Sequence, residues 1–172
     1  MNTSANNLLI VTPYTKRLGM AVFQDGELIY FGVKTFKRPR TAESISDETA
    51  NKLGELLDQF NPALVIVKSL TTHQTGSVKH RGIARTIKRT LNTVGISIVE
   101  SSFEEARRNL VAEDNPPKKS AFAILRKLYP ELARFVYFQN RHQSEYYTPM
   151  LAAITIGLAY RQEKPQNCAK GG

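Results

Sequence analysis

The chain has 172 residues, 41% of them hydrophobic, which is enough apolar material for one globular domain with a sizeable core. Lysine and arginine (24) outnumber aspartate and glutamate (15), and the formal net charge of +9 favours a polyanionic partner, nucleic acid ahead of acidic lipid. The single cysteine, Cys168, excludes a disulfide framework and a cysteine-based zinc site, and it fits a reducing, cytoplasmic setting.

The N-terminal part of the chain predicts a three-stranded antiparallel meander. Its apolar runs are Leu8–Val11, Gly19–Phe23 and Leu28–Val33. Asp25–Gly26 separates the last two, and Asp-Gly between β-rich runs is a strong hairpin signal because glycine adopts positive φ. The first run is apolar without alternation, so it should lie in the middle of the sheet. Residues 1–7 lack the basic stretch of a signal peptide and contain no membrane segment, and we expect them to be flexible.

The middle of the chain predicts two helices around a short strand. Ser46 is the expected N-cap of a helix that ends at Phe60, with Ile45 as a hydrophobic staple. The apolar strand Ala63–Val67 follows and should lie beside the first strand through a right-handed crossover. The second helix spans Val78–Val94 and ends at Gly95. Its inward face should carry Ile83, Ile87, Leu91 and Val94.

The remaining elements complete an α/β sandwich of the order βββαβαβα with extra helices before the last. Ser102 and Glu105 form a capping-box pattern at the start of a helix. The last helix should begin near Pro149, and a flexible tail should follow at 162–172. The expected elements are a strand at Ile96–Val99, helices ending near Val111 and at Lys118–Leu128, a strand or extended loop at Phe135–Phe138, and the last helix at Thr148–Arg161.

Basic residues gather where acidic ones are missing. No acidic residue lies between Asp58 and Glu100, and such asymmetry is more informative than the total charge. Each candidate has an ordinary alternative as a turn residue, a solvated helix face or a snorkelling lysine. The candidates for phosphate contact are Lys16, Arg17, Lys68, Lys79, Arg81, Arg85, Lys88, Arg89, Lys118 and Lys119.

Four stretches resemble the ribonuclease H-like superfamily and, within it, the RuvC-type Holliday junction resolvases. They are LLIVTPYTKRLGMAVF (Leu8–Phe23), Pro62–Ser69, Lys118–Leu132 and Tyr146–Tyr160. The resemblance implies a three-layer sandwich in which a mixed five-stranded sheet carries helices on both faces. It covers residues 8–161, which we expect to form a single domain.

In that family, carboxylates at the ends of strands one and four and at the start of the last helix bind two Mg²⁺ ions that cleave a phosphodiester. Matched residue by residue, these positions are Thr12, Lys68 and Ala152, with Pro149 a turn before Ala152. Mg²⁺ requires hard oxygen ligands, and a lysine beside it costs several kcal/mol even at an effective dielectric of about 20. We therefore predict a resolvase-like fold with no catalytic residues, no metal and no cofactor.

Other polar residues offer weaker candidates. Glu145, the nearest acid before the last helix, and Glu100, at the end of the fifth strand, could each supply one ligand of a relocated metal site, whereas Glu104 and Glu105 suit the start of a helix. Tyr146 and Tyr147 either stack on bases or, as we expect, pack between the last helix and the sheet. The histidines lack the spacing of a metal site and are expected at the surface: His73, His80 and His142.

Three functions remain open from the sequence. The first is a catalytically inactive protein that binds branched or duplex DNA, or structured RNA, through a basic cleft, with DNA favoured. The second is a Mg²⁺- or Mn²⁺-dependent endonuclease with relocated acidic ligands. The third is a protein-interaction module that retains only the fold. The resemblance also makes a homodimer possible.

Overall fold

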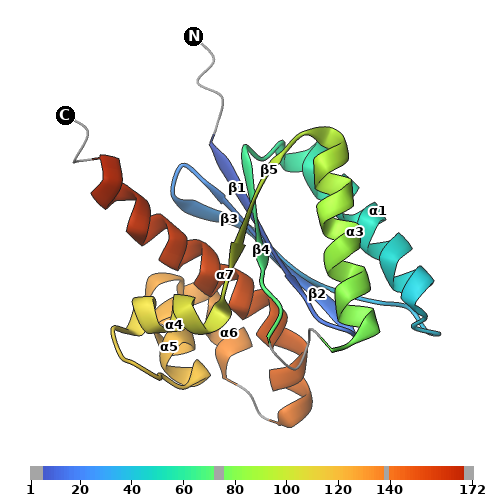
Figure 1. Cartoon of the computed structure of the whole chain (residues 1–172). Coiled ribbons are helices and arrows are strands. Elements are labelled where there is room, and N and C mark those ends of the chain that lie inside the picture. Colours follow the sequence, from blue (N-terminus) through green and yellow to red (C-terminus); the bar gives the residue numbers. More distant parts are fainter. Residues whose placement is uncertain (1–5, 72–75, 138–139, 169–172) are drawn as a thin grey trace.

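A computed structural model describes residues 6–71, 76–137 and 140–168, and the chain forms a mixed five-stranded sheet with helices on both faces (Figure 1). Helices α1 and α3 cover one face, and the long helix α7 crosses the other together with α4, α5 and α6. The strands are β1 (Asn7–Pro13), β2 (Arg17–Gln24), β3 (Glu27–Thr35), β4 (Leu64–Lys68) and β5 (Ser97–Ser101). The helices are α1 (Ala42–Phe60), α3 (Val78–Val94), α4 (Phe103–Val111), α5 (Lys118–Leu128), the 3₁₀ turn η1 (Pro130–Leu132), α6 (Ala133–Val136) and α7 (Arg141–Cys168).

The strand order β3-β2-β1-β4-β5 confirms the predicted fold class. Strand β1 pairs antiparallel with β2 and parallel with β4, and it is buried along its whole length, as its continuous apolar run predicts. Strands β4 and β5 are also parallel, so the C-terminal ends of β1, β4 and β5 meet at one edge of the sheet. This edge carries the site described below.

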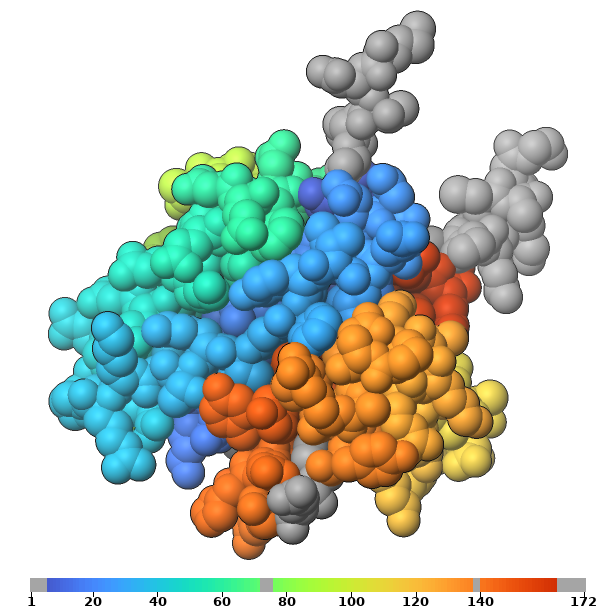
Figure 2. All heavy atoms as spheres, turned by 180° about the vertical axis from the view of Figure 1, so that it is seen from behind, coloured from blue at the N-terminus to red at the C-terminus, as the bar shows by residue number. Residues whose placement is uncertain are grey.

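Alternation along β1 divides the core into two clusters. Leu8 and Ile10 pack under α4, α5 and α7, whereas Leu9 and Val11 pack under α1 and α3. Strand β3 ends the sheet. It lies at the surface between α1, in cyan, and the orange segment that contains η1 and α6 (Figure 2).

Glycines at two contacts allow helix α7 to lie close against the sheet. A Cβ atom on Gly19 of β2 would lie under 3.0 Å from the backbone of Pro149 in α7. Gly157 of α7 in turn approaches the side chains of Phe23 and Ile10. Helix α7 begins at Arg141 and not at Thr148, and it continues to Cys168 through most of the stretch expected to be a flexible tail. The flexibility of 1–7 and of the C-terminal residues stays a prediction.

Several local predictions were wrong in detail. Thr41, not Ser46, caps α1, because Thr41 and Ser44 bond reciprocally to each other's backbone N–H groups, and Ile45 is a buried residue of the helix. Val94, expected on the inward face, is the last residue of α3 and is 56% exposed. The chain at Phe135 is helical (α6), not extended, and Phe138 lies outside the described residues. Among the described residues, no helix is both long enough and apolar enough to cross a bilayer.

Candidate functional site

The positions that carry metal-binding acids in the resemblance meet at the C-terminal edge of β1 and β4. Val11 pairs with Val67, which places the next residues, Thr12 and Lys68, side by side at the ends of their strands. Thr12 is fully buried, and its Oγ1 donates a hydrogen bond to the carbonyl oxygen of Pro149 at 2.5 Å. Ala152 follows one helical turn later and is also fully buried.

These residues do not fit a divalent metal ion. The Thr12 hydroxyl is neutral and engaged with Pro149, Ala152 has no side-chain donor atom, and Lys68 brings a positive charge. Mg²⁺ prefers carboxylates and other hard oxygen ligands, so this donor set opposes it. Across the described part of the chain, no group of three or more His, Cys, Asp or Glu residues is arranged to hold a metal ion.

Lys68 is a buried cation of the site. It is only 5% exposed, and its Nζ lies 4.9 Å from the centre of the Tyr14 ring. Burial lowers the pKa of Lys68, the nearby charge of Lys118 lowers this pKa further, and Glu104 acts in the opposite direction. Burial raises the pKa of the Tyr14 phenol to about 12 although Arg107 opposes the shift. The phenol therefore keeps its proton at neutral pH.

Lys68 lines a cavity of about 570 Å³, which we call the lysine cavity. Its walls come from the β1–β2 turn, the end of β4, the start of α4 and the start of α5, which are all segments at the same sheet edge. The cavity contains three cations and one carboxylate. The lining residues are Tyr14, Lys68, Ser69, Leu70, Thr71, Ser102, Phe103, Glu104, Arg107 and Lys118.

A second cavity, of about 300 Å³, adjoins the lysine cavity and shares Tyr14 and Lys118 with it. We call the two together the cleft. The second cavity is also lined by Thr15, Lys16, Arg17, His80, Ser144, Glu145, Thr148 and Pro149. Beyond Thr15 and Lys16, a shallow groove of about 690 Å³ continues past Arg38, Pro39, Arg40 and Lys79. Cations thus follow one another from α5 around the β1–β2 turn.

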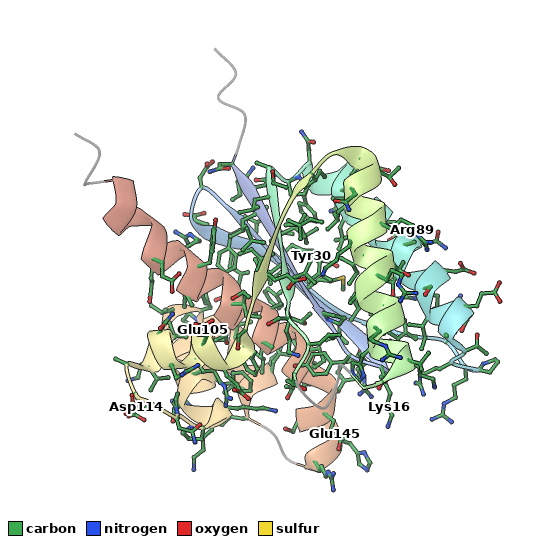
Figure 3. The ribbon with its side chains drawn as sticks, viewed as in Figure 1. Lys16, Tyr30, Arg89, Glu105, Asp114 and Glu145 are labelled. Carbon is green, nitrogen blue, oxygen red and sulfur yellow. The ribbon has the colours of Figure 1, made fainter. Side chains whose placement is uncertain are left out.

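The predicted phosphate-contact residues separate into two groups. Lys16, Arg17, Lys68, Lys79 and Lys118 line the cleft or the groove. The other five, as far as the described residues show, do not line these spaces and are exposed: Arg81, Arg85, Lys88, Arg89 and Lys119. Figure 3 shows Arg89 on the side of α3, well away from Lys16 and Glu145, which lie near the same end of the molecule. Lys88 forms an ion pair with Glu100 at 2.5 Å.

The two acids considered as relocated metal ligands do not share a cavity. Glu145 lines the second cavity of the cleft and pairs with Arg141 at 2.9 Å. Glu100 pairs with Lys88 and lines a separate cavity of about 240 Å³ with Glu105 and Glu163. Each carboxylate is therefore already balanced by a cation.

Sequence reasoning missed several residues of the site, among them Glu104, Arg107, Arg38 and Arg40. A signal for the first two was present, because Ser102 caps α4 directly after β5. Because β5 runs parallel to β4, its C-terminal end lies at the same edge of the sheet as the ends of β1 and β4. The first turns of α4, which follow β5 directly, therefore lie beside the site. Nothing local to Arg38 or Arg40 pointed to the groove.

The histidines and tyrosines agree with expectation only in part. His80 is half-buried and lines the cleft, where burial and then Lys68 lower the pKa of its imidazole. His142 is exposed as predicted, and His73 lies outside the described residues. Tyr147 packs against Phe135, with 4.9 Å between ring centres. The guanidinium of Arg17 lies 5.0 Å from the centre of the Tyr146 ring.

Known structures share this architecture. The RuvC structure of Thermus thermophilus matches with a TM-score of 0.68 at 13% identity, over 91% of this chain and 96% of that one. The chain has the ribonuclease H-like fold of RuvC-type resolvases. T. thermophilus RuvC in complex with a Holliday junction substrate matches with a TM-score of 0.66 at 13% identity, over 88% of this chain and 94% of that one.

A viral resolvase has the same RuvC-type fold. The Fowlpox virus resolvase, in complex with its substrate Holliday junction DNA, matches with a TM-score of 0.58 at 13% identity, over 91% of this chain and 97% of that one. No protein-family model and no curated protein sequence matches this chain. The similarity is therefore one of fold.

Proposed function

We propose that this protein is a resolvase-like protein, inactive as a metal-dependent nuclease, that binds nucleic acid through the basic cleft, with DNA preferred to RNA. One observation carries the proposal. Lys68 lies buried at the strand end where the resemblance expects an acid, and Arg107 and Lys118 line the same cavity. A site with this charge repels Mg²⁺ and attracts phosphate.

The balance of charge in the cleft supports an anionic ligand. Lys68, Arg107 and Lys118 face a single acid, Glu104, in the lysine cavity. In the second cavity the only acid among the described lining residues is Glu145, which pairs with Arg141. Clefts with low-dielectric walls and charges of one sign concentrate the opposite charge and accelerate its association.

Two unsatisfied donors point to the same kind of ligand. Among the described residues, the buried Nε atoms of Arg17 and Arg107 have no hydrogen-bond partner. Arg17 lines the second cavity and Arg107 lines the lysine cavity. A buried N–H without an acceptor costs about 1–3 kcal/mol, so both guanidinium groups would gain from an additional acceptor, and both belong to residues that line the cleft.

The solved complexes add support for a branched DNA ligand. The RuvC and Fowlpox virus structures are complexes with Holliday junction DNA, and both have the fold of this chain. Such a ligand would present more than one phosphate backbone. The cleft and the groove that continues past Lys16 and Lys79 offer two adjoining basic surfaces for it.

Binding is tested by fluorescence anisotropy with a labelled four-way junction, a flap, a duplex and a structured RNA over a salt series. We expect the logarithm of the association constant to fall linearly with the logarithm of salt concentration. Lys118→Ala should weaken binding and reduce the slope by about one. Lys127→Ala removes the same charge from the exposed, opposite end of α5 and is the matched control. No affinity for any nucleic acid at low salt would overturn the proposal in favour of a protein-interaction module.

Loss of nuclease activity is tested separately with intact junction, flap and duplex DNA in Mg²⁺ or Mn²⁺. We expect no cleavage above the buffer control. Dose-dependent cleavage that Glu145→Ala abolishes would overturn the proposed inactivity and establish the relocated endonuclease instead.

A further inference from the structure

The lysine cavity combines groups that phosphate binding alone does not require. A buried amine (Lys68), a protonated phenol (Tyr14) and a carboxylate (Glu104) line one space of about 570 Å³. In a site that only binds phosphate, cations would raise the affinity and a carboxylate beside them would lower it. The cavity therefore offers an amine, a proton donor and a base in one space.

Lys68 has the surroundings of a nucleophilic lysine. An amine attacks a carbonyl only when it is unprotonated, and proteins favour that form by removing the lysine from water or by setting another cation beside it. Both conditions hold for Lys68, which is 5% exposed and has Lys118 in the same cavity, and together they outweigh the opposing charge of Glu104. The Tyr14 ring, 4.9 Å from Nζ, covers one side of the amine.

If the ligand is nucleic acid, the group that the Lys68 amine could attack is an aldehyde of a damaged nucleotide. Intact nucleic acid has no aldehyde for an amine to attack, but a nucleotide that has lost its base opens to an aldehyde at C1′ of the deoxyribose. We propose, on the basis of the proposed nucleic-acid binding, that Lys68 forms a Schiff base with this aldehyde and that the cavity is an abasic-site DNA lyase centre. Arg107 and Lys118 would hold the flanking phosphates.

The reaction balances without a metal ion or redox partner. The Lys68 amine attacks C1′, the Tyr14 phenol donates a proton to the departing hydroxyl, and water leaves as the C=N bond forms. The Glu104 carboxylate removes a proton from C2′, the electron pair forms the C2′=C3′ double bond, and the C3′–O bond breaks. The 3′ strand leaves with a 5′-phosphate. Water then hydrolyses the protonated C=N bond, which releases the unsaturated sugar aldehyde and a proton and regenerates the amine. The proton that Glu104 took from C2′ returns through water to the Tyr14 phenolate, so both groups recover their starting forms.

The experiment traps the Schiff base by reduction. The full chain is incubated in EDTA with a labelled duplex that contains one abasic site, in the presence of sodium cyanoborohydride, and the products are separated on a denaturing gel. We expect a covalent protein–DNA adduct whose attachment point, mapped by mass spectrometry, is Lys68. Without the reductant we expect strand cleavage by elimination, with the 5′-phosphate product.

Variants separate the chemistry from binding and from folding. Lys68→Arg keeps the charge but cannot form the Schiff base, so it should lose the adduct while still binding the duplex. Glu104→Gln should slow cleavage by about 100-fold and leave trapping largely intact, because it acts after the C=N bond forms. Lys127→Ala should behave as the unmodified protein does. Thermal unfolding of each variant confirms that it is folded.

The outcomes distinguish this inference from the proposed function. A duplex with tetrahydrofuran in place of the abasic sugar binds but has no aldehyde, and it should give no adduct. If this analogue binds and the true abasic duplex gives no adduct, the lyase is refuted and the binding function stands. An undiminished adduct in Lys68→Arg would also refute the lyase, because another amine would then be reacting. If neither duplex binds, both proposals fail.

Discussion

Gly19→Ala should destabilise this protein strongly, although it adds only one methyl group. The Cβ of an alanine at this position would lie under 3.0 Å from the Pro149 carbonyl and from Oγ1 of Thr12. The obstacle is mostly backbone, which cannot rotate away, so α7 itself would have to move from β2. Overpacking a core typically costs about 1–3 kcal/mol, and a clash with backbone belongs at the upper end of that range.

The control is Gly54→Ala in α1, where an added Cβ meets nothing within 4 Å. Alanine is favoured over glycine inside a helix by roughly 0.5–1 kcal/mol, so this variant should be slightly stabilised. At about 2–4 °C per kcal/mol for a chain of this size, Gly19→Ala should lower Tm by roughly 6–12 °C, whereas Gly54→Ala should raise it by about 1–4 °C.

Urea unfolding followed by circular dichroism gives the free energies of unfolding, and scanning calorimetry gives Tm. A Gly19→Ala protein within about 0.5 kcal/mol of the unmodified chain would refute the close approach of α7 to the sheet, because ordinary surface substitutions fall in that range. Equal losses in both variants would refute the reasoning as well, since the sign of the effect is predicted to differ.

Three further predictions concern the site. Thr12→Val removes the hydrogen bond to Pro149 at nearly constant volume and should cost about 0.5–1.5 kcal/mol in urea unfolding; a variant as stable as the parent would contradict this contact. Lys68→Met should stabilise the protein, and the gain in stability over the wild type should be larger at neutral pH than at pH 10. The pKa of Lys68 is lower in the folded than in the unfolded chain, so the unfolded chain binds more protons and wild-type stability rises with pH towards 10.5, whereas methionine does not titrate. Urea unfolding of both proteins from pH 7 to 10 measures this difference in stability, and a difference that does not shrink as pH rises would contradict the prediction. The charged and titratable groups around Lys68 are Tyr14, His80, Glu104, Arg107 and Lys118. Lys88→Ala should cost less than about 1 kcal/mol of stability and weaken nucleic-acid binding less than Lys118→Ala does, because Lys88 pairs with Glu100 at the surface; equal losses of affinity in anisotropy titrations would place α3 in the interface.

Local patterns in the sequence were sufficient where the deciding interaction is itself local. The bounds of α3 and α5 agree with the prediction, and Gly95 takes the left-handed conformation that ends α3. The Asp-Gly turn joins β2 to β3, and the continuous apolar run of β1 correctly indicates a central strand. These outcomes depend on neighbours a few residues apart or on burial of both faces of one strand.

Predictions failed where two local signals competed or where distant packing decided. Ser46 and Thr41 are both suitable N-caps, and Thr41 is used because Ser44 completes its capping box. Phe135 belongs to the short helix α6, and its ring packs against Phe31 of β3 and Tyr147 of α7. These contacts join segments far apart in the chain, so no local sequence pattern predicts them.

The sequence by itself determined the charge of the protein, the order of the five strands, and the substitution of Thr12, Lys68 and Ala152 for the acids that the resemblance expects. Only the tertiary structure decided which of the many cations line one cavity, because the walls of a cavity come from segments far apart in the chain. Parallel pairing brings the ends of β1, β4 and β5 to one edge, so Lys68 meets Arg107 and Lys118 there. The same geometry leaves Arg85 and Arg89 exposed on α3 and pairs Lys88 with Glu100, although their sequence spacing looked equally favourable.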